Sequence, residues 1–137
     1  PCSAPATTPA APTRPPIAVG DGDEPFTGSV GEVIEWNEYQ QVFAKMVGFV
    51  ETLETAIRTI GDCDQLAAAM AIIMDDGRAD VVRVRELRPR VAPGRRQLVD
   101  AAYNERILAA SAAMTHGLEQ GCAAHAGVRA VLARSPL

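Results

Sequence analysis

The longest regular pattern in the chain is a stripe of apolar residues between positions 36 and 60. Its members follow one another in steps of three and four residues: Trp36, Tyr39, Phe43, Met46, Val50, Leu53, Ile57 and Ile60. This spacing places all of them on one face of an α-helix. Ser29 and Glu32 stand in the positions of a capping box, and Gly61 follows the last apolar residue. We therefore expect a first helix that starts near Ser29 and ends at Gly61.

A second helix is expected over residues 62–87. Asp62 is a suitable N-cap, and Gln65 stands three residues later in the capping-box position. The apolar positions that follow repeat at helical spacing on one face: Cys63, Leu66, Met70, Ile73, Val81, Val84 and Leu87.

Gly77 leaves an alternative open within this second segment. Asp76-Gly77 is also a hairpin signal, and residues 82–85 alternate between valine and arginine, so residues 70–74 and 81–87 could pair as strands. A helix accepts Gly77 at a cost of about 1 kcal/mol relative to alanine. An isolated two-stranded hairpin is itself only marginally stable, so the helix is favoured.

Two further helices complete the pattern. Pro89 and Pro93 bracket a loop, and a third helix is expected from about Gly94 to Gln120. Its inner face carries Val99, Tyr103, Ile107, Ala110, Met114 and Leu118. A short fourth helix is expected over residues 124–134, with Val128, Val131 and Leu132 on one side. The predicted fold is an all-α antiparallel bundle of three long helices and a short C-terminal fourth.

The first 28 residues do not continue this pattern. Residues 1–25 carry seven of the ten prolines, and alanine, threonine and serine fill most of the remaining positions. Such a composition cannot bury enough apolar surface to offset the entropy of ordering it. We expect a disordered, Pro-rich tether over residues 1–28 and a helical domain over residues 29–137.

Two cysteines are expected at the same end of the bundle. Helices over 62–87 and 94–121 would span about 39 and 42 Å, and a short connection would make them neighbours. Cys63 opens the first of these helices and Cys122 follows the second. A disulfide between them would contribute about 4 kcal/mol on the chain-entropy model. The alternative is a pair of buried free thiols that behave as small hydrophobic residues.

Charge is divided unevenly along the chain. Residues 1–77 carry twelve acidic and three basic residues, a net charge of −9, whereas residues 78–137 carry five acidic residues and ten arginines, a net charge of +5. Six arginines surround the predicted turn between the second and third helices: Arg83, Arg85, Arg88, Arg90, Arg95 and Arg96. They form a candidate surface for an anionic partner, and the alternative is that they are solvated or paired within the molecule. The few aromatic residues fall mostly on apolar faces, which argues against nucleic acid as a partner.

The sequence contains no recognisable catalytic motif. It lacks a Gly-x-Ser-x-Gly elbow, a P-loop and the Glu-x-x-His pairs of di-iron bundles. Covalent haem would need Cys-x-x-Cys-His, whereas the chain has Cys122-Ala-Ala-His125. Axial ligands for a non-covalent haem could come from Met46, Met70, Met74, Met114, His116 and His125. His116, His125 and Cys122 are the candidates for zinc or copper. We expect neither a cofactor nor catalysis, and a haem- or metal-binding electron carrier is the alternative.

Two resemblances bear on the compartment. Cys2, at the head of the Pro-rich segment, resembles the lipid-bearing first residue of a mature bacterial lipoprotein, although Pro1 stands where a small residue is usual. The chain also resembles uncharacterised lipoproteins of myxobacteria-like organisms. The resemblance lies in the stretch Gly61-Asp-Cys-Asp-Gln-Leu-Ala-Ala-Ala-Met70, in Cys122, and in the segment from His125 to Leu132. These lipoproteins have a low-complexity head, a helical domain and a cysteine pair, but no known activity.

The resemblances imply an exported protein in the periplasm or at the cell surface. The chain begins with proline rather than methionine, so we expect a processed or truncated form, whose lost part could have carried an export signal. No run of 18 or more apolar residues would span a membrane, so a lipid on Cys2 would be the means of attachment. The expected role is a non-catalytic interaction or structural module with a protein or cell-envelope partner. A cytosolic helical protein with reduced cysteines remains a further alternative.

Overall fold

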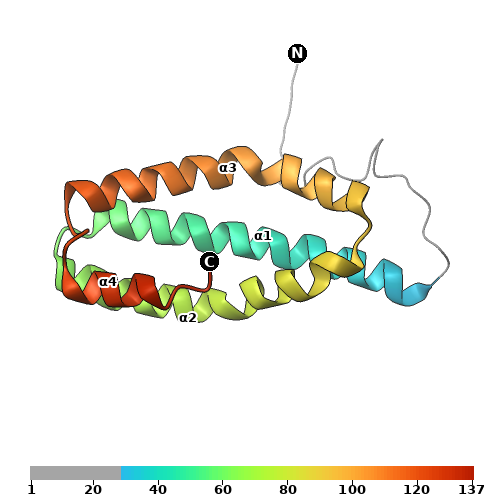
Figure 1. Cartoon of the computed structure of the whole chain (residues 1–137), viewed down its shortest axis with the longest axis horizontal. Helices are drawn as coiled ribbons and strands as arrows, with labels where there is room; N and C mark the ends of the chain where they lie inside the picture. The colour runs from blue at the N-terminus through green and yellow to red at the C-terminus, as the bar shows by residue number, and fades with distance from the viewer. Residues whose placement is uncertain (1–28) are drawn as a thin grey trace, which may run out of the picture.

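The structure, a computed structural model, describes residues 29–137, and this part of the chain is all-helical (Figure 1). Its elements are α1 (Val30–Thr59), α2 (Cys63–Leu87), the 3₁₀ turn η2 (Arg88–Arg90), α3 (Pro93–Gln120) and α4 (Ala126–Ala133). The prediction of three long helices and a short fourth is confirmed. Within residues 29–137 there is no strand, so the hairpin alternative for residues 70–87 is wrong. The expected tether and Cys2 lie outside the described residues.

The first three helices each begin at a residue that is suited to a helix N-terminus. Ser29 caps α1, where its Oγ accepts a hydrogen bond from the Glu32 N–H at 3.0 Å. Asp62 caps α2, where its Oδ1 accepts from the Gln65 N–H at 2.8 Å. Each cap satisfies one of the N–H groups that lack a partner in the first turn of a helix. Pro93 begins α3 at a position where a missing N–H costs nothing.

Helix α1 is the centre of the molecule. It packs against α2 and against α3, while α4 packs against α2 (Figure 1). The expectation that the second and third helices are close neighbours is corrected, because each packs mainly on α1. The reason is the width of the apolar face of α1, which buries Val42, Val47 and Phe49 in addition to the stripe. A helix with so wide a face can serve two partners at once.

The core lies along α1 in two clusters. One, near the Cys63 end of α2, contains Phe49, Leu53, Leu66, Met70, Met74 and Val128 among its members. The other, near η2, contains Tyr39, Phe43, Val47, Leu87, Val99 and Tyr103 among its members. Helix α3 buries only four of its residues, Arg95, Val99, Tyr103 and Ala110, so most of its surface faces solvent.

Gly77 lies in the middle of α2, and the ring of Phe49 explains why. A Cβ atom placed on Gly77 would stand 2.3 Å from Phe49 Cδ1 and 2.4 Å from Phe49 Cγ. The glycine therefore lets α1 and α2 approach each other closely, rather than forming a turn. The intrinsic cost of glycine in a helix is offset by the burial of a phenylalanine that is 7% exposed.

Within the described range, no helix is both long enough and apolar enough to cross a membrane.

Candidate functional site

The two cysteines meet where α2 begins and α3 has ended. The Sγ atoms of Cys63 and Cys122 lie 2.12 Å apart and their Cα atoms 5.5 Å apart, so they are at disulfide distance, as predicted. Cys63 is the first residue of α2, and Cys122 lies two residues after Gln120, the last residue of α3. Cys122 is 5% exposed. The link thus joins the two helices that flank α1, at the end far from η2 (Figure 1).

His125 forms a second connection beside this link. Its Nδ1 accepts a hydrogen bond from the Val128 N–H at 3.2 Å, so the imidazole is the N-cap of α4. Since Nδ1 is an acceptor, the proton of the neutral ring is assigned to Nε2, which donates to Asp64 Oδ1 at 2.8 Å. One side chain therefore begins α4 and ties it to the first turn of α2. Sequence reasoning considered His125 only as a metal or haem ligand and missed this role.

The other residues considered as ligands are dispersed. Met70 and Met74 are buried in the apolar core, and Met46 and Met114 pack partly against it. His116 lies exposed on α3. Among residues 29–137, no group of three or more His, Cys, Asp or Glu side chains is placed to hold a metal ion.

Two of the six candidate arginines form bidentate ion pairs within the molecule. Arg83 of α2 donates to both carboxylate oxygens of Glu38 at 2.7 Å, and also to Glu86 at 3.2 Å. These hydrogen bonds from Arg83 lower the pKa of Glu38 below its ordinary value. Arg88 donates to both oxygens of Asp100, at 3.1 and 2.8 Å, and this pairing raises the pKa of the guanidinium.

Arg88 also reaches the phenol of a buried residue. It donates to the Tyr39 hydroxyl at 2.8 Å. Tyr39 is fully buried, and its burial raises the pKa of the hydroxyl. The hydrogen bond satisfies a polar atom that would be costly to bury alone.

The remaining four arginines contact other parts of the same chain. Arg90 pairs with Glu35 at 2.9 Å, and Arg96 donates to the Arg88 carbonyl at 3.1 Å. Arg95 is buried, with its guanidinium 6.0 Å from the centre of the Trp36 ring. Arg85 donates to the Pro136 carbonyl. The structure thus gathers Arg88, Arg90, Arg95 and Arg96 around the α2–α3 connection, with much of their charge compensated locally, and directs Arg85 to the C-terminal segment.

The division of charge along the chain corresponds to ion pairs between helices. Acidic residues of α1 face arginines from the later helices: Glu35 with Arg90, Glu38 with Arg83, and Glu51 with Arg106 at 2.6 Å. The Arg106 hydrogen bond lowers the pKa of Glu51. The uneven division of charge in the sequence thus corresponds in part to pairing within the molecule, which was the alternative to a surface for an anionic partner.

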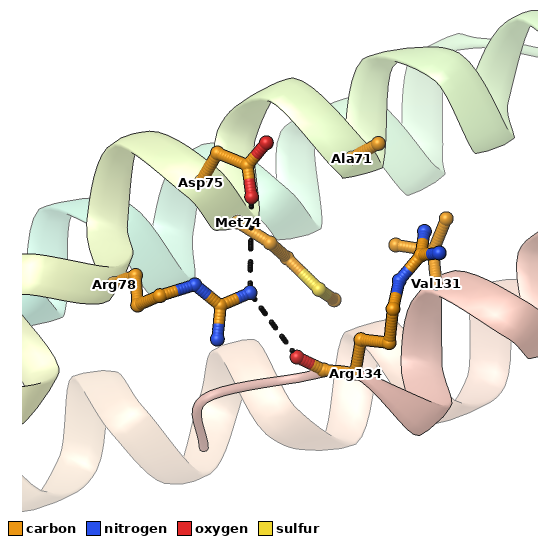
Figure 2. Close-up of a pocket in the computed structure, with 6 residues that line it drawn as sticks. All are labelled: Ala71, Met74, Asp75, Arg78, Val131 and Arg134. Atoms are coloured by element: carbon orange, nitrogen blue, oxygen red, sulfur yellow. Dashed lines mark hydrogen bonds and ion pairs between the residues drawn. The ribbon is translucent and has the colours of Figure 1, made fainter.

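A hollow of about 320 Å³ lies between α2 and α4. Figure 2 shows its six lining residues, Ala71, Met74, Asp75, Arg78, Val131 and Arg134. Arg78 spans it, donating to the Arg134 carbonyl at 3.3 Å and approaching Asp75 at 3.7 Å. Sequence reasoning did not find this site, because its two sides come from segments more than 50 residues apart and carry no shared motif.

Comparison with protein-family models, curated proteins and solved structures finds no match to this chain.

Proposed function

We propose that this chain is an exported, non-catalytic helical interaction module, anchored through a lipid on Cys2. In this proposal residues 1–28 form a disordered tether that holds an antiparallel bundle away from the membrane. The resemblance to lipoproteins supports the anchor, and the reversal of chain direction at successive connections in Figure 1 supports the antiparallel arrangement.

The observation that carries the proposal is the meeting of Cys63 and Cys122. Disulfides form and persist mainly in oxidising compartments such as the periplasm and the cell surface. The two cysteines close a segment with a sequence separation of 59, for which a disulfide is worth about 4 kcal/mol. A small domain that buries little of α3 would gain much of its stability from such a link. The junction therefore favours export over a cytosolic location.

The pairing of the polar side chains supports a binding role without catalysis. Both nitrogens of His125 are engaged, one by the cap of α4 and one by Asp64. Glu38 and Glu51 are held in ion pairs with arginines. These groups brace the helices against one another, which suits a rigid module that presents a surface.

The test of the proposed compartment is a mass measurement on protein from its native cells. Cells are lysed in a thiol-alkylating reagent, and intact mass is recorded with and without prior reduction. We expect two additional alkyl groups after reduction, located at Cys63 and Cys122, and an added acyl mass at Cys2. Alkylation of Cys63 and Cys122 without reductant would overturn export. An unmodified Cys2 would overturn the anchor.

The proposed partner surface is the arginine-rich connection between α2 and α3, and it needs a separate test. Arg90 is suited to the test because it is more exposed than Arg88 and pairs with a single carboxylate. Arg58 is a matched control, since it is also exposed, pairs with one carboxylate, Glu54, at 3.1 Å, and lies at the other end of α1. Partners captured from envelope extracts by the wild-type protein should be lost in Arg90→Ala and retained in Arg58→Ala, and loss should also follow added salt. Equal capture by both variants would remove this surface from the proposal.

A further inference from the structure

Helix α3 is buried unevenly along its length. Its four buried residues all lie at or before Ala110. In residues 111–120, Met114 and Leu118 pack partly against the core, and no residue is fully buried. Burial of apolar surface is the main favourable contribution to packing, so the C-terminal part of the helix is held to the bundle more weakly than its first part.

Polar contacts do not compensate for this shallow burial. Among residues 29–137, Arg106 is the last side chain of α3 that forms a hydrogen bond or an ion pair with another helix, and its partner is Glu51 of α1. Further along, Gly117 lies against Ile57 of α1, where an added Cβ would stand 2.8 Å from Ile57 Cγ2. The two backbones approach closely there, but a glycine adds no side chain to the contact.

A second hollow, of about 220 Å³, lies between this part of α3, α1 and α4. Met114 and Leu118 line it from α3, and Leu132 lines it from α4 and is 37% exposed. Side chains that border a gap lack neighbours on one side and lose part of their dispersion attraction. The C-terminal part of α3 therefore gains little from α4.

The Cys63–Cys122 pair is the covalent attachment at the end of this segment. Cys122 is 5% exposed and meets Cys63 at the first residue of α2. Beyond it, α4 has attachments of its own to α2, because Val128 is buried in the core and His125 is hydrogen-bonded to Asp64. Breaking the disulfide would leave α4 in place and free the segment that precedes it.

We propose that this disulfide is a redox switch: its reduction by a dithiol releases residues 111–120 from α1 while the rest of the bundle stays folded. A thiolate of the dithiol attacks Sγ of Cys63, which is more exposed than Cys122. The bond between the two cysteines breaks, and its electron pair passes to the Cys122 sulfur. The second thiol of the reductant then displaces the Cys63 sulfur. The reductant leaves as a cyclic disulfide, and its two protons pass to the two protein thiols.

Release would expose apolar surface on both helices. Leu53 and Ile57 of α1 are 2% and 8% exposed while α3 covers them. A helical segment as short as residues 111–120 is only marginally stable in water without tertiary contacts, so its amides would exchange with solvent. This inference does not depend on the proposed export or anchor, because it concerns the purified chain.

The experiment is amide hydrogen exchange on the purified, oxidised chain before and after treatment with dithiothreitol. After reduction, the amides of residues 111–120 should exchange at least about tenfold faster than before. Their rates should hardly change when a low concentration of urea is added, because a local opening exposes little surface. Exchange in residues 47–53 of α1 should stay slow and should accelerate with urea, because it requires unfolding of the whole domain. Circular dichroism establishes that the reduced chain is folded.

Two variants separate this switch from a general loss of stability. The double variant Cys63→Ser/Cys122→Ser should exchange like the reduced protein, with or without dithiothreitol. Val47→Ala keeps the disulfide and removes buried volume from the cluster near η2, which lowers the stability of the whole domain. It should not produce urea-independent exchange in residues 111–120. The proposal is overturned if reduction leaves exchange in that segment unchanged, if the reduced chain unfolds as a whole, or if Val47→Ala opens the same segment.

Discussion

Replacing Gly77 with alanine tests whether the packing of α1 on α2 is as close as described. In an open helical position the change would stabilise the protein by about 1 kcal/mol, because alanine is the better helix former. At Gly77 the new Cβ would lie 2.3 to 2.8 Å from three atoms of the Phe49 ring. Non-bonded carbon atoms rest about 3.5–4.0 Å apart, so the ring or the helix must move by about 1 Å or more.

The magnitude follows from two opposing effects. Overpacking a core costs about 1–3 kcal/mol, and the upper half of that range applies because Cγ, the ring atom closest to the backbone, is among the clashing atoms. After the propensity gain is subtracted, we expect Gly77→Ala to lower the free energy of unfolding by about 1–2 kcal/mol. Gly48→Ala is the control, because a Cβ there meets nothing within 4 Å. It should raise the free energy of unfolding by about 0.5–1 kcal/mol.

Urea denaturation of the two variants and the wild type measures these changes. A double-mutant cycle with Phe49→Leu identifies the cause: the smaller side chain should remove most of the penalty of Gly77→Ala, giving a coupling energy of about 1–2 kcal/mol. A Gly77→Ala protein that is more stable than the wild type would refute the close contact, and so would a coupling energy near zero.

Three further predictions concern the junctions described above. Replacing Cys63 and Cys122 together with serine should lower the free energy of unfolding by about 4 kcal/mol, measured by urea denaturation; an unchanged midpoint under non-reducing conditions would contradict the link. Glu51→Gln should make the free energy of unfolding depend less on pH at acid pH. The folded pKa of Glu51 is lowered from 4.5, so the contribution of its carboxylate to stability is present above pH 4.5 and is lost as the pH falls through the lowered value. Free energies of unfolding that run parallel for the wild type and the variant between pH 6 and the acid transition would argue against this pairing. His125→Ala should cost about 0.5–2 kcal/mol through loss of the α4 cap and speed amide exchange in α4, whereas His116→Ala on the exposed face of α3 should do neither.

The helices were predictable because their signals are local. Successive residues of the apolar stripe from Trp36 to Ile60 are three or four positions apart. The caps at Ser29 and Asp62 each bond to an N–H three positions later. The agreement between these signals and the observed bounds reflects local preferences and tertiary packing acting in the same direction.

What the sequence could not decide depends on contacts between distant residues. Gly77 is compatible with a turn or a helix until Phe49 of α1 is placed against it. The arrangement of α2 and α3 on two sides of α1 depends on residues outside the simple stripe, such as Val47. The role of His125 was not predictable, because a histidine cap carries no frequent sequence signature and its second partner, Asp64, lies 61 residues away.

The starting position of α1 decides at which end of the domain the N-terminal segment joins. Glu35, in the second turn of α1, pairs with Arg90 of η2, so the first helix begins at the same end as the α2–α3 connection (Figure 1). Whatever precedes residue 29 joins the domain at that end. A support that holds the protein from its N-terminal side would therefore lie nearest to the guanidinium groups around η2. The Cys63–Cys122 pair lies at the opposite end of the domain, farthest from that support.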